Sequence, residues 1–222
     1  MNTRTGGQIV AQTLHQLGAE VIFSVSGNQI LPIYDAIADH GLRLIHMRHE
    51  SAAAYAAAAS AEVSNRPGVV LVSAGPAFVS ALAGLAEARS MELPLLFLSG
   101  TGERGDAGRG GFQDFDQHTA AGTMCKASME ATAVEQIHSV LSHAWQLAQM
   151  GIPGPVHISL PVDVLLATAT TQSDISNHSV PLPPVVPAHE DALRTMAQRL
   201  LEARRPLLIA RPVPRVEQPE RH

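Results

Sequence analysis

The sequence predicts an α/β protein in which a doubly wound, mostly parallel sheet of about six strands carries helices on both faces. Short apolar runs with strand character alternate along the chain with helix-like segments, and the connections between them are short. This repeated βα order favours right-handed crossovers and parallel pairing. Hydrophobic residues make up 45% of the 222 residues and charged residues 16%, so the chain can bury a sizeable core.

The individual strands and helices are predicted from the pattern of apolar residues and from the glycines and prolines at their ends. Strands are expected where apolar residues run continuously, at 21–25, 42–47, 68–73, 93–98 and 155–160. Helices are expected where apolar or alanine-rich positions share one face, at 8–17, 30–37, 51–63, 78–89 and 133–150. Gly18 suits the end of the first helix, and Pro76 suits the first turn of the helix that it precedes. A glycine-rich loop is expected at 100–111.

Composition changes towards the C-terminus. Residues 1–165 are expected to form one domain and residues 166–187 a linker, because 167–179 is rich in serine and threonine and 180–187 holds four prolines. A helix at 188–203 and a strand at 206–210 resemble the start of a second α/β domain. One helix and one strand cannot bury a core alone, so we expect residues 188–222 to be an incomplete domain and the chain to be truncated.

Charge and cysteine content exclude several classes of protein. The formal net charge is −5, with 15 basic and 20 acidic residues, which argues against a nucleic-acid-binding surface. The single cysteine, Cys125, fits a reducing compartment and is expected to fill the core. Residues 1–7 do not resemble a signal peptide, and no run approaches the ~20 apolar residues of a membrane span. A cytoplasmic protein without membrane contact is expected.

Three loops at strand ends carry the candidate functional residues. Arg48-His49-Glu50 follows the second expected strand, Ser73-Ala74-Gly75-Pro76 follows the third, and Ser26-Gly27-Asn28 follows the first. Ligands of open parallel sheets bind beyond the carboxyl ends of the strands. Glu50 there could donate or accept a proton if an apolar pocket raised its pKa. Position alone favours the simpler interpretation, a first-turn acid that the helix dipole stabilises, and leaves the catalytic one open.

Two other patterns give weaker signals. Gly100 to Gly105 matches the dinucleotide pattern G-x-G-x-x-G, but more glycine follows instead of a helix, so a mobile loop is expected there. His46 and His49 should point to opposite sides of a strand end, and His138 and His143 are five residues apart on a helix. These spacings are poor for a metal site, and no metal ligands are assigned.

Together, the segments at 25–28, 48–53, 73–76, 111–114 and 154–164 resemble the N-terminal pyrimidine-binding domain of thiamine-diphosphate-dependent enzymes of the acetolactate synthase-like superfamily. The resemblance extends over residues 4–165, with the opening of that superfamily's central domain at 188–210. It implies a lyase or transferase that acts on a 2-oxo acid or related acyl donor, with thiamine diphosphate as cofactor.

The resemblance also implies roles for single residues. Glu50 would hydrogen-bond the aminopyrimidine ring of the cofactor and so promote loss of the proton from its thiazolium carbon. Gln113 would be a second catalytic residue. The remaining cofactor contacts implied are Gly27, Asn28, Gly75, Pro76 and Phe112.

The magnesium half of the implied site has no match in this chain. The family binds the diphosphate and Mg²⁺ through Gly-Asp-Gly and a later asparagine, which are oxygen ligands suited to Mg²⁺. Gly105-Asp106-Ala107 is only superficially similar, and no asparagine occurs between Asn65 and Asn177. We therefore expect the chain alone to be inactive. The missing half would come from a homo-oligomer, a dimer in this family, or from a partner with the diphosphate-binding domain.

Two alternatives remain open. Departures from the family pattern at Ala59, Ser60 and Ser80 fit a non-catalytic remnant, or a small subunit that serves in assembly with a diphosphate-binding partner. A generic nucleotide-binding α/β domain is the other alternative, and the glycines that continue after Gly105 argue against it.

Overall fold

The computed structural model describes residues 2–171 and 188–207. The chain divides into two compact units, residues 1–182 and residues 183–222, and each is described by itself.

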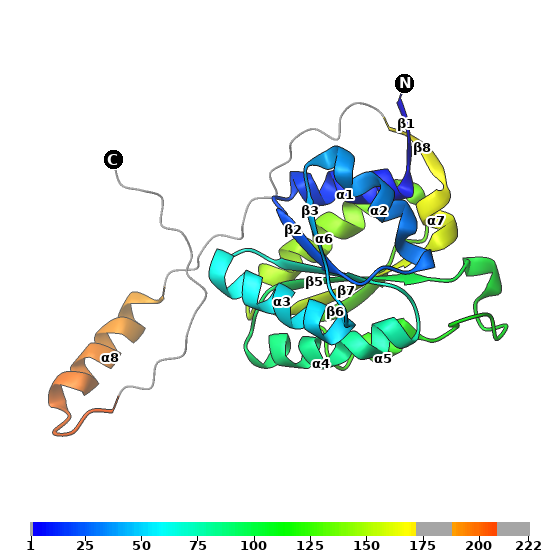
Figure 1. The fold of residues 1–222 in the computed structure, drawn as a ribbon. Coiled ribbons are helices and arrows are strands. Elements are labelled where there is room, and N and C mark those ends of the chain that lie inside the picture. Colours follow the sequence, from blue (N-terminus) through cyan, green and yellow to red (C-terminus); the bar gives the residue numbers. More distant parts are fainter. Residues whose placement is uncertain (1, 172–187, 208–222) are drawn as a thin grey trace. The chain divides into compact units, whose positions relative to one another are not determined.

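A six-stranded sheet forms the centre of the first unit (Figure 1). Its order is β3-β2-β4-β5-β7-β6, and every neighbouring pair is parallel. The strands are β2 (Val21–Ser24), β3 (Arg43–His46), β4 (Gly68–Val72), β5 (Leu95–Thr101), β6 (Ala127–Glu130) and β7 (Pro155–Pro161). The predicted doubly wound α/β fold is thus confirmed.

Helices cover both faces of the sheet (Figure 1). One face carries α1 (Gly6–Gln16), α2 (Leu31–Ile37), α6 (Ile137–Gln149) and α7 (Val162–Leu166). The other carries α3 (Glu50–Ser64), α4 (Pro76–Ser90) and α5 (Gln117–Ala121). Short 3₁₀ turns lie at Asn28–Ile30, Ala38–His40, Arg104–Asp106 and Val134–Gln136.

Strand alternation divides the apolar residues into two cores. On β5, Leu96 and Leu98 face the core of α1, α2 and α6, whereas Leu95 and Phe97 face the core of α3 and α4. The second core is built largely from small side chains. A Cβ on Gly84 of α4 would lie 2.5 Å from the Cβ of Ala54 on α3, so these helices approach as closely as their alanines and this glycine allow.

Local sequence signals set most helix ends. Thr5 and Gln8 form a capping box at the start of α1, a signal that the sequence carries but that the expected start at residue 8 overlooked. Asn65, at φ 55°, closes α3 in the left-handed conformation, and Pro76 occupies the first turn of α4 as predicted. The segment after Gly100 forms no α-helix until α5, which agrees with the predicted loop.

Several elements were not predicted. β6, α5 and α7 are short, and β1 (Asn2–Thr5) pairs antiparallel with β8 (Thr168–Thr171). This pairing extends the folded unit beyond residue 165, where the sequence places the start of the linker. Residues 172–187, the rest of that expected linker, lie outside the described residues.

The second unit contains α8 (Glu190–Glu202), within the helix expected at 188–203. Its described side chains are largely exposed. The strand expected at 206–210 is described only at its first two residues, which form no strand, and the remainder lies outside the described part of the chain.

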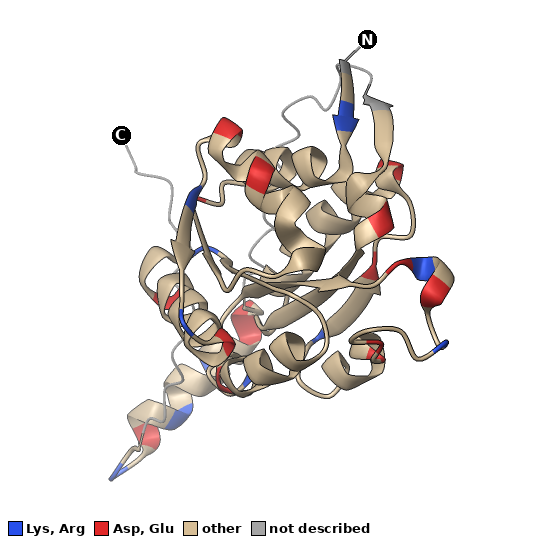
Figure 2. Ribbon diagram, turned by 45° about the vertical axis from the view of Figure 1, so that its right-hand side comes forward, with Lys and Arg blue, Asp and Glu red and all other residues tan. Residues whose placement is uncertain are grey.

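Charge is sparse and mixed on this structure. Figure 2 shows acidic and basic residues scattered over the described ribbon, without a basic stripe. None of the helices in 2–171 and 188–207 has the length and apolar character that would let it span a bilayer.

Candidate functional site

The loops at the carboxyl edge of the sheet meet at a reversal of strand order. β3 and β4 flank β2 on opposite sides, so the chain changes direction between β2 and β4, the position where such sheets bind ligands. Gly27 follows β2 and Ser73 follows β4. A Cβ on Gly27 would lie 2.4 Å from both Cβ and Oγ of Ser73, so glycine is needed for the two loops to touch.

Glu50 is the first residue of α3, directly after the β3 loop, and its side chain is partly buried. The His49 ring caps this helix, since its Nδ1 accepts from the Ser51 N–H at 3.2 Å. The Ser51 hydroxyl donates to the Ser80 carbonyl on α4 at 2.5 Å. No residue in the described ranges forms a hydrogen bond or an ion pair with the Glu50 carboxylate. The acid is therefore held at a helix N-terminus and is available to a ligand.

The turn at Gly75 is fixed from behind by Gln117. Gly75 has φ 56° and ψ −113°, a conformation that favours glycine. Its N–H donates to Gln117 Oε1 at 3.2 Å. Gln117 Nε2 donates in turn to Ser99 Oγ at 3.2 Å and to the Gly100 carbonyl at 3.1 Å. No sequence pattern indicated this role, because Gln117 lies in α5, which was not predicted.

A buried histidine continues this network under the sheet edge. His157 on β7 is fully buried, with Nε2 2.8 Å from Ser99 Oγ and Nδ1 2.7 Å from Ser128 Oγ. Ser99 thus lies between Gln117 and His157, and the two serine hydroxyls can satisfy both ring nitrogens of His157 in either neutral tautomer. Burial, with a smaller effect from His118, lowers the pKa of His157 to about 3. The ring is therefore neutral at physiological pH.

Gln113 comes to Gly75 from the loop after β5. It has φ 63°, and a Cβ on Gly75 would lie 2.9 Å from the Cβ of Gln113. Gln29 Nε2 donates to Gln113 Oε1 at 3.0 Å, and the Ser73 hydroxyl donates to Gln29 Oε1 at 2.5 Å. The structure thus brings two predicted residues, Gln113 and Gly75, together and adds Gln29, which the sequence did not single out.

Two pockets flank this edge. A pocket of about 770 Å³ is walled by the loop after β5, including Phe112 and Gln113, and by Gln29 and Gln117. Phe112 itself is 83% exposed. A second pocket of about 470 Å³ lies between α1, α2 and α7, and Asn28 lines it. Asn28 thus lines a different pocket from Gln113, although its neighbour Gln29 contacts Gln113. The other predicted residues, Gly27, Glu50, Gly75 and Pro76, line neither pocket.

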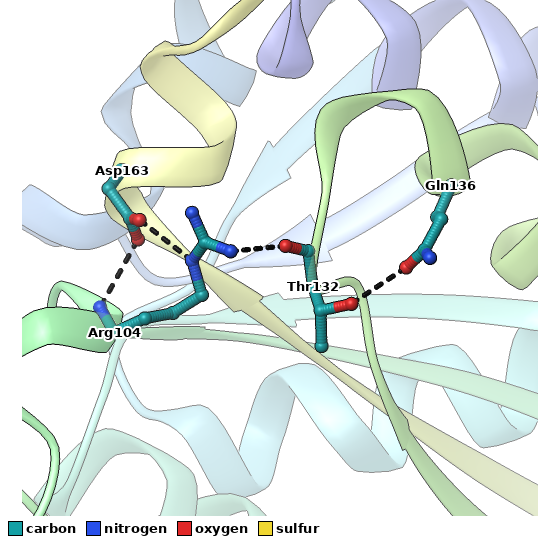
Figure 3. A network of polar contacts seen from close by, with 4 residues as sticks. All are labelled: Arg104, Thr132, Gln136 and Asp163. Carbon is teal, nitrogen blue, oxygen red and sulfur yellow. Dashed lines mark hydrogen bonds and ion pairs between the residues drawn. The ribbon is translucent and has the colours of Figure 1, made fainter.

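Arg104 anchors the base of the loop after β5 (Figure 3). Its backbone N–H and Nε–H donate to the Asp163 carboxylate on α7 at 3.3 and 2.8 Å. Its Nη1–H donates to the carbonyl of Thr132, whose hydroxyl donates to Gln136 Oε1 at 2.8 Å. The beginning of the loop is thereby tied to α7 and to the turn after β6.

Cys125 and the other potential metal ligands form no second reactive centre in the described ranges. Cys125 is buried, and burial raises the pKa of its thiol to about 12, in agreement with its expected place in the core. Within 2–171 and 188–207, no three His, Cys, Asp or Glu side chains are grouped so as to hold a metal ion.

Comparison with known proteins assigns the fold and this edge to a family. The model of "Thiamine pyrophosphate enzyme, N-terminal TPP binding domain" matches residues 4–120, which include the loops at Gly27, Glu50, Gly75 and Gln113. The chain belongs to the thiamine pyrophosphate (TPP) enzymes. The resemblance drawn from the sequence is confirmed.

Individual relatives agree with this assignment. The chain is 34% identical over 205 residues to 2-hydroxyacyl-CoA lyase 1 of Mus musculus. This alignment covers 92% of the chain and 35% of the relative. It is 33% identical over 207 residues to the acetolactate synthase large subunit of Lactococcus lactis subsp. lactis. This alignment covers 93% of the chain and 36% of the relative. The chain thus spans about a third of the length of these relatives.

The carboxyl edge fits the pyrimidine ring of TPP but not its metal-bound diphosphate. The Glu50 carboxylate has no protein partner among the described residues and can meet a polar ring, whereas Ser73 fills the space beside Gly27 and Gln113 fills the space beside Gly75, which is buried. By contrast, no three His, Cys, Asp or Glu side chains of the described residues are grouped so that they could hold Mg²⁺.

Proposed function

We propose that this chain supplies the pyrimidine side of an active site that uses TPP to act on a 2-oxo acid or a related acyl donor. The observation that carries the proposal is the Glu50 carboxylate. It is partly buried, it begins α3, the helix that connects β3 to β4 and packs over the strand-order reversal of a TPP-binding fold, and it lacks a partner among the described residues. A structural first-turn acid would gain from the helix dipole alone, but it would not need to lie beside this reversal.

Glu50 would act on a proton of the cofactor. When bound, TPP supplies an electron-accepting thiazolium ring, which stabilises the carbanion left by loss of an acyl substituent. Glu50 would hydrogen-bond a ring nitrogen of the aminopyrimidine and favour the tautomer whose exocyclic nitrogen can take a proton. Such positioned acid–base groups typically contribute about 10²–10⁴-fold to rate.

The neighbouring loops would form the walls of the pyrimidine site. Gly27, Gly75 and Pro76 would line the ring. Both glycines let these loops pack closely, since a Cβ at Gly27 would clash with Ser73 and one at Gly75 would clash with Gln113. Phe112 and Gln113 would approach the substrate from the loop after β5. Asn28 would also contact the cofactor from the loop after β2. Its position in this structure is at the pocket beside α2.

The diphosphate and Mg²⁺ would be bound by residues outside this chain. They would come from a polypeptide with the diphosphate-binding domain, and the completed enzyme would be an oligomer, with a dimer as its smallest form. We place it in the cytoplasm. This chain alone would lack lyase or transferase activity.

Turnover tests the proposal directly. The chain is combined with the diphosphate-binding half, and TPP-dependent turnover is measured with a 2-oxo acid such as pyruvate and with a 2-hydroxyacyl-CoA. We expect Glu50→Gln to lower kcat by about 10²-fold or more. Glu62→Gln, at an exposed position near the other end of α3, is the matched control and should leave kcat unchanged.

Equal rates for wild type and Glu50→Gln would remove the role of Glu50. Absence of TPP-dependent turnover with both substrates, in an assembled complex, would favour the alternative that the chain serves only in assembly. The preferred substrate of the two decides between a synthase-like and a lyase-like activity.

A further inference from the structure

Three polar side chains at the carboxyl edge lie against three glycines. Gln29, Ser73 and Gln113 come from segments that are far apart in the chain. A Cβ on Gly27 would lie 2.4 Å from the Oγ of Ser73, one on Gly75 would lie 2.9 Å from the Cβ of Gln113, and one on Gly100 would lie 2.7 Å from the Cβ of Gln29. Each polar side chain thus occupies space that a missing side chain leaves, so all three are confined by the backbone around them.

The hydrogen bonds among these three residues have a direction. Ser73 Oγ and the facing Gln29 atom are 2.5 Å apart, which is at the short end of the O–H···O range and below the N–H···O range. Gln29 therefore turns its carbonyl oxygen to Ser73 and its Nε2 to Gln113, where it donates to Oε1 at 3.0 Å. Since Oε1 is engaged, the group that Gln113 leaves available is its NH₂.

The pocket around Gln113 is otherwise rich in acceptors. Its lining includes carboxylates at 103, 106, 114, 116 and 130, which only accept hydrogen bonds when ionised. Arg104 also lines the pocket, but its guanidinium donates to Asp163 and to the Thr132 carbonyl. The lining also includes Thr101, His118 and Ser159, which can donate, so Gln113 adds an amide donor of fixed direction to a lining dominated by acceptors.

We propose that Gln29 is a positioning residue that fixes the polarity of the Gln113 amide, so that the site presents N–H donors to a carbonyl or carboxylate oxygen of the acyl donor. This proposal rests on the proposed function for its substrate, but its geometry stands on this chain alone. A Gln113 amide that is free to flip could present either its donors or its acceptor to the substrate. By preventing that flip, Gln29 makes the site selective for substrates with an acceptor oxygen.

The hydrogen bonds from Ser73 to Gln29 and from Gln29 to Gln113 form what we call the relay. The Gln29→Glu variant reverses the direction of its second hydrogen bond and keeps the shape of the side chain. The ionised carboxylate that it introduces still accepts from Ser73, but it can only accept from Gln113. The Gln113 amide must then turn its NH₂ inward and leave Oε1 facing the pocket. Gln29→Met is the matched control, because it retains the side-chain length and removes both hydrogen bonds without imposing either orientation.

Side-chain amide hydrogen exchange, measured by NMR on the uniformly ¹⁵N-labelled 222-residue chain, reads the polarity without cofactor or substrate. In the wild type we expect slow exchange for the Gln29 NH₂ and fast exchange for the Gln113 NH₂, with a difference of about 10-fold or more. In Gln29→Glu the Gln113 NH₂ should become slow, and in Gln29→Met it should stay fast. Slow exchange of Gln113 in the wild type, or no change in Gln29→Glu, would overturn the proposal.

Substrate kinetics of the assembled enzyme measure the effect of the Gln113 amide orientation on turnover of the acyl donor. We expect Gln29→Glu to lower kcat/KM for the acyl donor by about 10- to 100-fold, with the Kd for TPP changed less than about 2-fold. Gln29→Met should lower kcat/KM by less than about 5-fold. Equal losses for the two variants would contradict polarity control.

The two measurements separate the two proposals. If the exchange pattern is as expected but no TPP-dependent turnover is found, the proposed function fails and the relay stands. If turnover depends on Glu50 but the exchange pattern is reversed, the relay fails and the proposed function stands.

Discussion

The buried ring of His157 should make the stability of the first unit depend on pH in a defined window. The ring packs against the side chains of Phe78 and Phe97, with ring centroids 5.2 and 5.1 Å away. Hydrogen bonds to Ser99 and Ser128 satisfy both of its nitrogens as a neutral group. Its pKa falls from the ordinary 6.5 to about 3 on folding. Below pH 6.5 the unfolded chain therefore binds a proton that the folded chain does not.

The sign and size follow from proton linkage. Because the unfolded state binds more protons, the free energy of unfolding should fall as the pH falls, by about 1.4 kcal/mol per pH unit. The contribution of His157 is complete above pH 6.5 and is lost progressively towards pH 3. Between pH 6.5 and 5 the loss should be about 2 kcal/mol, and over the whole window about 5 kcal/mol.

Urea unfolding between pH 5 and 7.5 measures this effect. His157→Gln can keep one donor and one acceptor in the cavity but does not titrate, so its stability should fall less steeply with pH, by about 1.4 kcal/mol per unit below pH 6.5. His143→Gln, at an exposed position of α6, should keep the wild-type slope. Parallel profiles for wild type and His157→Gln would refute the account of a neutral, buried ring.

Three further outcomes follow from the described contacts. Gly27→Ala should lower the free energy of unfolding by about 1–3 kcal/mol in a urea titration, because its Cβ would overlap the loop after β4, whereas Gly102→Ala, with no atom within 4 Å, should be neutral. Arg104→Gln should speed proteolytic cleavage in the loop after β5 with a small change in Tm, because the partly exposed Arg104–Asp163 pair holds that loop. Cys125 should resist alkylation at pH 8 in the native chain and react once urea unfolds it, because its pKa is raised to about 12.

Long apolar patterns were readable from the sequence because burial on both faces leaves little choice of residue. β4 and β7 are buried throughout, β5 is buried except at Thr101, and all three were predicted within a few residues. β6, with the sequence Ala-Ser-Met-Glu, is short and only partly buried, so it carries no apolar run. The strand β8 shows the same limit, because its partner β1 lies more than 160 residues away in the chain.

The candidate site divides in the same way. Glu50, Gly75 and Gln113 belong to local patterns, and a family resemblance could therefore point to them. Gln29 and Gln117 act through side chains that reach other segments, Gln113 and Gly75 respectively. Only the folded arrangement of the strand ends brings these pairs within hydrogen-bonding distance.

The exchange rate of the thiazolium carbon proton of TPP tests the central claim most directly, because it isolates the step assigned to Glu50 from substrate binding. TPP is bound to the assembled enzyme in deuterated buffer, the sample is quenched in acid, and the remaining proton signal is measured by NMR. We predict that Glu50→Gln slows this exchange by about 10²-fold or more, while Glu62→Gln leaves it unchanged. Equal exchange in the wild type and in Glu50→Gln, with TPP bound to both, would contradict the account.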